Sequence, residues 1–455
     1  MEMVLEFLRD VLSQPALLIG IMSCVGLVAL KRPFHKVMTG TLKPILGYLM
    51  LAAGAGVIVS NLDPLGKMIE HGFHITGVVP NNEAIVAVAQ KVLGVETMSI
   101  LVVGLLMNLC IARFTKFKYV FLTGHHSLFM ACLMSAVLGT AGLSGMELIL
   151  VGGFLMGAWS AISPAIGQSY TSKVTDGDEI ALGHFGSLGY YLSAWVAKYV
   201  GKAEDSTEDI EIPEKWGFLR DSTLSTALTM IVFYLIAALA AGSEFVATLS
   251  GSMSPYLFAV MSAMNFAVGV AIVYSGVRMI LGDLIPAFQG IATKIIPNAI
   301  PAVDCAVFFT YAPTAVVLGF ISSFIGGIIG MLILGAVGGV LIIPGLVPHF
   351  FCGATAGIYG NATGGRRGAA VGAFLNGLAI TFLPALALPV LGQLGFQNTT
   401  FGDADFAVMG LVLGNAFEWI GMAGIYGVVV IAALVLIIPN FIKTKGKVIN
   451  YVEEE

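Results

Sequence analysis

The chain has 455 residues, of which 57% are hydrophobic and 11% are charged, and its formal net charge is −5. Soluble domains carry about 25% charged residues, so this composition excludes an ordinary soluble protein and predicts a polytopic membrane protein. Uninterrupted apolar runs exclude a membrane β-barrel, whose strands alternate apolar and polar residues over short segments.

Eleven apolar segments, taken in chain order, are suited to cross a hydrocarbon core of about 30 Å as helices. They lie at residues 12–30, 44–62, 97–113, 119–139, 146–166, 223–242, 254–279, 301–320, 321–344, 368–391 and 414–442. An amphipathic stretch at 1–14 precedes them without the pattern of a cleavable signal. We therefore predict an all-α fold, with a single integral-membrane domain over residues 1–455 and about eleven transmembrane helices.

Three segments between the spans are predicted not to cross the membrane as simple helices. Residues 63–96 and 167–202 are too polar for simple spans, and they indicate re-entrant or interfacial pieces. Residues 203–222 are charge-dense and predict a cytoplasmic loop between an N-terminal half, about 1–202, and a C-terminal half, about 223–447. A docking surface for a soluble partner is the alternative use of this loop.

The basic residues orient the spans, because cytoplasmic loops hold the excess of Lys and Arg. With eleven crossings, 19 of the 22 basic residues fall on one side, and Arg9, Lys67 and Lys91 fall on the other. We therefore predict that the N-terminus lies outside and the C-terminus lies in the cytoplasm. One missed or extra crossing would break this agreement.

Asp304 stands at the edge of a long uncharged stretch, since no formal charge occurs from Cys305 to Gly365. A carboxylate at membrane depth costs roughly 2.5–3.5 kcal/mol and usually persists because it faces a polar cavity or a substrate. Pro301 and Pro313 break the surrounding helix pattern, which membrane proteins tolerate inside protein or along a water-filled path. We interpret the stretch as the substrate site of a transporter. An aspartate that caps a helix at the membrane interface is the alternative.

Two histidines follow glycines at similar breaks. His125 ends the sequence FLTGH, and His184 ends VTDGDEIALGH. Imidazoles inside a membrane domain usually face its interior, where they donate and accept hydrogen bonds. Together with Asp304 they suit a small molecule with many oxygens, whereas each histidine alone is equally typical of a buried, satisfied side chain.

A weak internal repeat sets residue n beside residue n + 250, so that Gly54 in the segment AAGAG falls on Asp304. Transporters commonly carry repeats whose interrupted helices meet at the substrate site. The repeat predicts Gly54 on the wall opposite Asp304, although two glycine-rich apolar segments also match by chance.

We predict no metal site, no cofactor and no nucleic-acid partner. His71 and His74 are three residues apart but lie in a polar, exposed-looking segment, and outside that segment no histidine and carboxylate have ligand spacing on one helix. The five cysteines are scattered and indicate buried thiols rather than disulfides. The sequence has no phosphate-binding Gly-Lys-Ser/Thr loop.

These motifs resemble the membrane permease component, enzyme IIC, of the bacterial phosphotransferase system for L-ascorbate, in the ascorbate–galactitol superfamily. The resemblance rests on FLTGH, VTDGDEIALGH, IPNAIPAVDC and LIIPGLVPHFF and extends over nearly the whole chain. It implies a homodimer in the bacterial inner membrane, with eleven transmembrane segments per protomer and a core domain that moves against a scaffold domain in elevator fashion. It also implies uptake of L-ascorbate, which a separate soluble IIB protein, supplied by IIA, phosphorylates on arrival. The phosphocysteine then belongs to IIB, and this permease subunit carries no phosphoryl group itself.

The resemblance also places substrate contacts on particular residues. The glycine-rich turn, the histidines of TGH and GH, and the aspartate of DC correspond here to Gly54, His125, His184 and Asp304. We expect two more residues, from segments that line the same site, to contact the substrate: Asn82 and Thr355.

One departure from the family leaves the exact substrate open. Ascorbate permeases carry glutamines shortly after both histidines, whereas this chain has the sequences SLF at 127–129 and FGS at 185–187. Galactitol or another polyol is the alternative substrate of the same machinery. An ion-coupled secondary transporter would instead use Asp304 or Glu418 as a proton or sodium ligand. An intramembrane enzyme has the least support, because the sequence shows no nucleophile–base or metal pattern.

Overall fold

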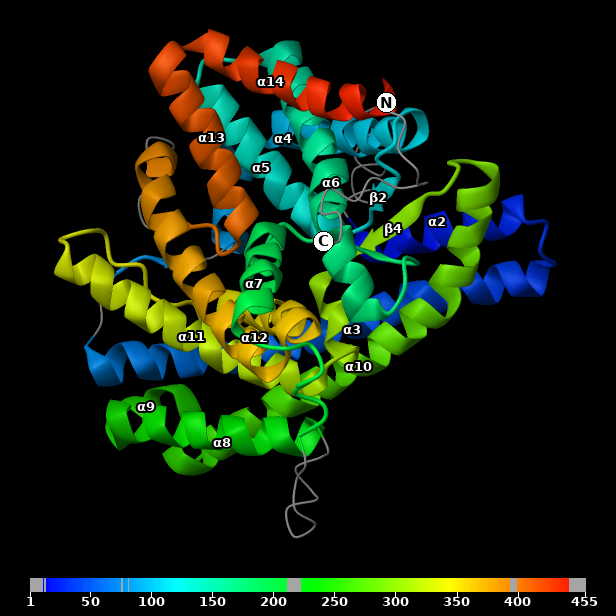
Figure 1. Cartoon of the computed structure of the whole chain (residues 1–455). Helices are drawn as coiled ribbons and strands as arrows, with labels where there is room; N and C mark the ends of the chain where they lie inside the picture. Colours follow the sequence, from blue (N-terminus) through cyan, green and yellow to red (C-terminus); the bar gives the residue numbers. More distant parts are fainter. Residues whose placement is uncertain are drawn as a thin grey trace.

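The computed structural model describes residues 11, 14–74, 77–80, 82–210, 222–392 and 399–441, and most of its elements are helices (Figure 1). The helices are α2 (Pro15–Ala29), α3 (Phe34–Phe73), α4 (Asn82–Phe114), α5 (Gly124–Thr140), α6 (Gly145–Thr175), α7 (Ser187–Val200), α8 (Ser222–Ala241), α9 (Ser243–Ser250), α10 (Pro255–Lys294), α11 (Pro313–Ala336), α12 (Leu346–Gly392), α13 (Ala404–Ile420) and α14 (Met422–Ile437). The short strands and 3₁₀ helices are β1 (Val79–Pro80), β2 (Tyr119–Phe121), β3 (Ala181–Leu182), β4 (Ile300–Val303), β5 (Thr399–Thr400), η2 (Cys305–Thr310) and η3 (Ile438–Phe441).

The helices form two groups. The α3 group holds α2, α3, α8, α9 and α10, and its long helices α3 and α10 pack along each other. The α12 group holds α4 to α7 and α11 to α14, with α12 packed on α11 and α7, and α4 packed on α5 and α6. In Figure 1, α8 and α9 lie at the bottom and α13 and α14 at the top. This division suits the predicted core and scaffold, while movement of one group against the other stays a prediction.

Glycines let α3 and α10 approach closely. A Cβ atom on Gly54 would lie 2.7 Å from the carbonyl oxygen of Gly269, and one on Gly47 would lie 2.8 Å from the carbonyl oxygen of Gly276. Small residues are typical of such crossings in membranes, where lipid is as apolar as the side chains and close backbone packing drives helix association. Gly54 is therefore a packing residue between two long helices.

Helix α12 is interrupted at Gly364 and Gly365, whose backbone leaves the helical conformation. Gly365 has a φ of +58°, and a Cβ atom there would lie 2.4 Å from the carbonyl oxygen of Asp205. The break lets the start of the predicted cytoplasmic loop bind to α12, since the Arg366 N–H donates to that same Asp205 oxygen at 2.8 Å. Residues 211–221 of this loop lie outside the described residues.

Seven helices in the described ranges are long and apolar enough to cross a membrane. An eighth crossing results if α8 and α9, which are bent by 118° relative to each other, count as one span. The prediction of a multi-pass helical membrane protein is therefore confirmed, whereas eleven crossings stay a prediction. The spans predicted at 44–62, 146–166 and 254–279 lie inside the longer helices α3, α6 and α10.

Two predicted stretches differ from the structure. The sequence predicts two spans over 301–344, but β4 and η2 occupy 300–310 and the single helix α11 follows. Prolines explain this, because Pro301 cannot donate inside a helix and Pro313 suits the first turn of the next one. The span predicted at 414–442 is divided at Gly421, whose φ of +61° ends α13 and begins α14.

Of the two stretches predicted as re-entrant or interfacial, 63–96 consists mostly of the ends of two long helices, whereas 167–202 holds only the end of α6 and then shorter elements. Between 63 and 96, α3 continues to Phe73 and α4 begins at Asn82. Between 167 and 202, α6 continues to Thr175, and β3 and the short helix α7 follow.

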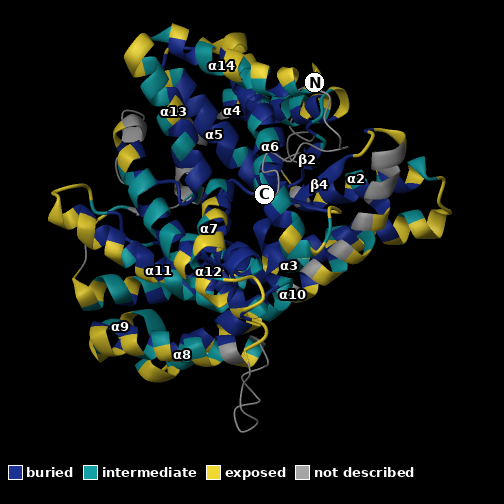
Figure 2. Cartoon of the chain, in the orientation of Figure 1, coloured by how far each residue is buried: buried dark blue, intermediate teal, exposed yellow. Residues whose placement is uncertain are grey.

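Large apolar side chains are exposed on the outer faces of both groups, while the interior between the helices is buried (Figure 2). Exposed examples are Leu46, Leu239, Leu332 and Ile431. Soluble monomers rarely expose extensive apolar surface. The outer faces therefore suit contact with lipid.

Candidate functional site

Three parallel strands bring the predicted site residues together. Strands β2, β4 and β3 form one sheet with β4 in the middle, and the Gly183 N–H extends it by donating to the Val303 carbonyl oxygen at 2.7 Å. The carboxyl ends of parallel strands meet at one edge of a sheet, which is where open α/β sheets bind ligands. His125, His184 and Asp304 each follow one of these three ends.

A second parallel pair, β1 and β5, adds polar side chains in the same way. Asn82 follows β1 and Asp403 follows β5. The Asn82 amide Nδ2 donates to Asp403 Oδ2 at 2.6 Å, and its Oδ1 accepts the Gly402 N–H at 2.9 Å. Five strands of two small sheets thus end at one polar centre.

His125 and Asp304, named here the front pair, lie nearest to α3. His125 Nε2 lies 3.4 Å from Asp304 Oδ2, and the Tyr48 hydroxyl of α3 lies 3.2 Å from His125 Nδ1. Asp304 caps η2, because its Oδ1 accepts the Ala306 N–H at 3.0 Å. Since a carboxylate only accepts hydrogen bonds, we assign the His125 proton to Nε2 and let Nδ1 accept the Tyr48 hydroxyl.

His184 and Asp403, named here the rear pair, are more enclosed. His184 Nδ1 lies 3.8 Å from Asp403 Oδ1, accepts the Gly186 N–H at 3.1 Å and lies 2.9 Å from the Tyr190 hydroxyl. Burial lowers the pKa of the His184 imidazole, against the opposing effect of Asp403 and Asp304, and favours the neutral ring. Because Nδ1 accepts, we place the proton on Nε2.

Asp405 fixes the loop that carries His184. Its Oδ1 accepts the Leu188 N–H at 2.9 Å, and its Oδ2 accepts the Ser187 hydroxyl at 2.7 Å and the Trp159 indole N–H at 3.2 Å. The Asp405 N–H in turn donates to the Phe185 carbonyl oxygen at 2.9 Å. A carboxylate at the first turn of α7 satisfies donors that the helix leaves free.

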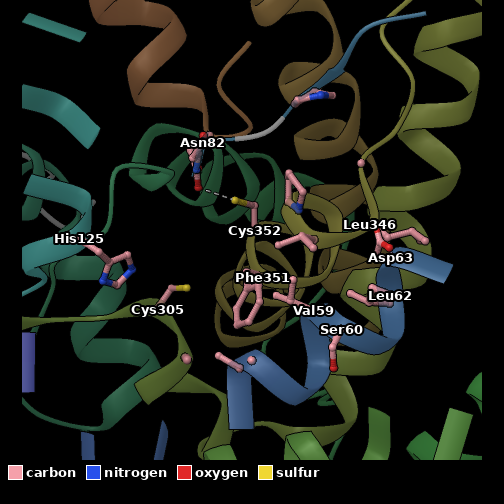
Figure 3. A pocket seen from close by; sticks show the side chains of 18 of the residues that line it. Val59, Ser60, Leu62, Asp63, Asn82, His125, Cys305, Leu346, Phe351 and Cys352 are labelled. Atoms are coloured by element: carbon pink, nitrogen blue, oxygen red, sulfur yellow. Dashed lines mark hydrogen bonds between the residues drawn. The ribbon is translucent and has the colours of Figure 1, made fainter. Parts of the chain in front are cut away.

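A cavity of about 890 Å³ lies between the α3 group and these strand ends. Figure 3 shows His125, Cys305 and Cys352 on one side, with Val59 and Ser60 of α3 on the other. Exposure falls along the cavity, since the side chain of Asp63 on α3 is 61% exposed, that of His125 38% and that of Asp304 8%. The volume is within the range of small-molecule sites, about 300–1,000 Å³.

The structure brings four of the six predicted site residues to this cavity, namely Asn82, His125, His184 and Asp304. Gly54 lies instead at the crossing of α3 and α10, whereas its neighbours Ala52 and Ala55 line the cavity. Thr355 lies behind the wall, fully buried, and donates to the Phe351 carbonyl oxygen at 2.7 Å.

Sequence reasoning missed several residues of the wall: Tyr48, His126, Cys352 and Asp403. A signal for Asp403 was present, because Asp403 and Asp405 stand in an apolar segment and invite the argument used for Asp304. Glu418, the alternative ion ligand, is exposed on α13 and does not line the cavity.

Two sets of side chains in the described ranges have the donors and spacing to hold a metal ion. One set is His126, His184 and Asp403, and the other is His184, Asp304 and Cys305. Within each set the ligand atoms lie within 4.8 Å of one another. The spacing argument could not find either set, because the residues come from different elements.

Comparison with known proteins gives two findings. Residues 10–405 match a family model described as PTS system sugar-specific permease component. The chain is also similar to a protein of Mycoplasma pneumoniae named ascorbate-specific PTS system EIIC component, with 27% identity over 417 residues that cover 78% of this chain and 62% of that protein. The chain therefore spans less than two thirds of the length of this relative.

Proposed function

This chain belongs to the family of sugar-specific permease components of PTS systems, and from that premise we propose that it binds L-ascorbate and carries it across the bacterial inner membrane. A separate soluble IIB protein, supplied by IIA, phosphorylates the substrate on arrival. The named specificity of the Mycoplasma pneumoniae relative supports ascorbate over galactitol or another polyol.

One observation carries the proposal, namely that the cavity between the two helix groups ends on the front pair and Asn82. Ascorbate presents hydroxyl groups and ring oxygens, which need donors and acceptors at fixed positions. The Asp304 carboxylate accepts from substrate hydroxyls, and the His184 Nε2–H donates to a substrate oxygen. The His125 Nε2–H faces Asp304 Oδ2 at 3.4 Å and orients that carboxylate toward the substrate. Asn82 already donates one amide N–H to Asp403 and accepts the Gly402 N–H, which leaves its second N–H for the substrate.

The exposure of the residues along the cavity indicates to which side of the membrane the cavity opens. Its exposed end lies at Asp63 and Lys67 of α3, both more than half exposed, and its floor lies at Asp304. In the predicted orientation, residues 63–96 lie outside the cell. We therefore infer an outward-facing conformation, with the homodimer and the elevator movement as further parts of the same proposal.

Ligand binding to detergent-purified protein tests the substrate. We expect ascorbate to raise the unfolding temperature and to give a saturable isotherm in calorimetry, and galactitol to give a weaker response. His125→Ala should abolish the ascorbate response, while His35→Ala, at an exposed position near the start of α3, should leave it unchanged. A stronger response to galactitol would reassign the substrate.

Uptake into vesicles tests the machinery. We expect ascorbate to accumulate as its phosphate only when IIA and IIB with a phosphoryl donor are supplied. Accumulation of unmodified ascorbate driven by a proton or sodium gradient, without phosphocarriers, would favour an ion-coupled transporter instead.

A further inference from the structure

A cysteine, a carboxylate and an imidazole converge at the floor of the cavity. Cys305, Asp304 and His184 are 1%, 7% and 4% exposed, and one ligand atom from each lies within 4.8 Å of the other two. The three side chains come from two strand ends of the same sheet. We propose that Asp304, Cys305 and His184 bind a thiophilic divalent cation, best matched by Zn²⁺, in competition with the substrate.

The donor set suits zinc. Three protein ligands of the Cys, His and carboxylate types, with a fourth position left for water, are typical of open zinc sites. Ligand atoms of a tetrahedral site with such bonds are separated by about 3.5 Å. The three ligand atoms lie within 4.8 Å of one another, so side-chain rotations would have to bring them closer on binding. A further imidazole nitrogen, His125 Nε2, lies 3.4 Å from Asp304 Oδ2.

The surroundings of His184 also suit a metal ligand. Its Nδ1 faces Asp403 Oδ1 at 3.8 Å and the Tyr190 hydroxyl at 2.9 Å, which leaves Nε2 for the ion. On binding, the imidazole proton moves from Nε2 to Nδ1 and points to the Asp403 carboxylate, an arrangement that orients metal-bound histidines in many proteins. In exchange, the Gly186 N–H loses its acceptor.

Metal binding changes the protonation of two of the three ligands. The Cys305 thiol loses one proton to solvent and becomes a thiolate ligand, Asp304 binds as a carboxylate, and His184 stays neutral with its proton on the other nitrogen. Metal binding therefore releases one proton for each ion.

The second set, His126, His184 and Asp403, is the weaker candidate. Both Asp403 oxygens already accept hydrogen bonds, from Asn82 at 2.6 Å and from the Cys352 thiol at 2.9 Å. His126 Nδ1 accepts the Phe185 N–H at 3.3 Å. Asp403 is thus better placed to support His184 than to bind the ion itself.

Spectroscopy with Co²⁺, a probe of zinc sites, tests the site without any substrate. We expect one Co²⁺ per chain, with a sulfur-to-metal charge-transfer absorption that Zn²⁺ abolishes. Cys305→Ser should remove this absorption and weaken Zn²⁺ binding at least tenfold in chelator competition. Cys352→Ser, in the same cavity wall, and Cys132→Ser, buried inside α5, should both keep it.

Two further measurements decide the details. Asp403→Asn should keep the absorption but weaken Zn²⁺ binding about tenfold, as expected for a residue that orients a ligand. Calorimetry in buffers of different ionisation enthalpy should show one proton released. Absence of the absorption, or its persistence in Cys305→Ser, would overturn the site.

The competition with substrate rests on the proposed function and is tested separately. A Zn²⁺ concentration that saturates the wild type but leaves Cys305→Ser mostly unoccupied should raise the apparent Kd for ascorbate at least tenfold in the wild type and leave it almost unchanged in the variant. Independent binding of Zn²⁺ and ascorbate would overturn the competition. Co²⁺ binding by a protein that binds no ascorbate would sink the proposed substrate and leave the metal site standing.

Discussion

The front and rear pairs have the same chemistry but different surroundings. In the front pair, His125 is 38% exposed and its Nδ1 contacts the Tyr48 hydroxyl across the boundary between the two helix groups. In the rear pair, His184 is 5% exposed and the N–H of Gly186, two residues away, fixes its Nδ1. The difference suggests that the front pair meets the ligand first and changes with the relative position of the groups, while the rear pair is a rigid floor.

The rigidity of the floor is tested by Asp405→Ala, the change with the largest expected effect. It removes the acceptor of the Leu188 N–H, the Ser187 hydroxyl and the Trp159 N–H, and each unsatisfied buried donor costs about 1–3 kcal/mol. We expect a loss of about 3 kcal/mol or more in stability, together with loss of ligand binding. Thermal unfolding in detergent and calorimetry measure both.

A matched control removes a more exposed aspartate. Asp283→Ala takes away the partner of Lys43 at 3.5 Å, and such exposed pairs contribute about 0–1 kcal/mol. Asp405→Asn keeps one acceptor oxygen, so its loss of stability should lie between those of Asp283→Ala and Asp405→Ala. Wild-type stability and affinity in Asp405→Ala would show that the His184 loop is held without this carboxylate.

The front pair is tested by Asp304→Asn. The amide oxygen still accepts the Ala306 N–H, so stability should change little. Loss of the charged acceptor should weaken ascorbate binding by about 10–100-fold, as expected for hydrogen bonds to a charged group. Calorimetry measures the change, and an unaltered isotherm would remove Asp304 from the ligand site.

The contact between the groups is tested by Tyr48→Phe. The change removes the hydroxyl that lies 3.2 Å from His125 Nδ1, and a neutral hydrogen bond contributes about 1 kcal/mol. We expect ascorbate affinity to fall about fivefold. Tyr234→Phe, which removes the hydroxyl bonded to the Asn61 carbonyl oxygen elsewhere in the α3 group, should leave affinity unchanged. Equal affinities in both variants would show that α3 does not orient the front pair.

The smallest expected effect on affinity is that of Gly54→Ala. Its Cβ atom would press on the Gly269 carbonyl oxygen, and overpacking of this kind costs about 1–3 kcal/mol. Stability should fall while the affinity of the folded protein stays within about twofold. Gly282→Ala on α10 is the control, because its Cβ atom meets nothing within 4 Å and Gly282 does not line the cavity. Weaker binding by Gly54→Ala at full stability would return Gly54 to the ligand site, as the sequence argument expected.

Local sequence signals predicted those cavity residues whose charge or polarity is unusual at membrane depth. Asp304 in an uncharged stretch, and His125 and His184 after glycines, are visible because charge and polarity at membrane depth are costly and rarely retained without a function. The same cost applies to Asp403 and Asp405, two carboxylates in an apolar segment near the C-terminus.

The repeat argument predicts Gly54 at the ligand site, whereas in the structure Gly54 packs on α10, because composition does not report which face of a helix a residue occupies. Gly54 and Ala55 are adjacent, yet one faces α10 and the other faces the cavity. Likewise, Thr355 shares a polar segment with residues of the wall but lies behind them. Helical rotation decides such cases, and only packed neighbours fix it.

By itself, the sequence determined that this is a multi-pass helical membrane protein of the phosphotransferase permease type, since hydropathy and local motifs are properties of short stretches. The tertiary structure alone decided that Asp403 lies beside His184 and that the Tyr48 hydroxyl contacts His125. It also decided that Cys305 lies next to His184 at the floor of the cavity. Asn82 and Asp403, hydrogen-bonded although 321 residues apart, show the reason. The pairing of distant strands depends on how whole helices pack, and no local pattern records it.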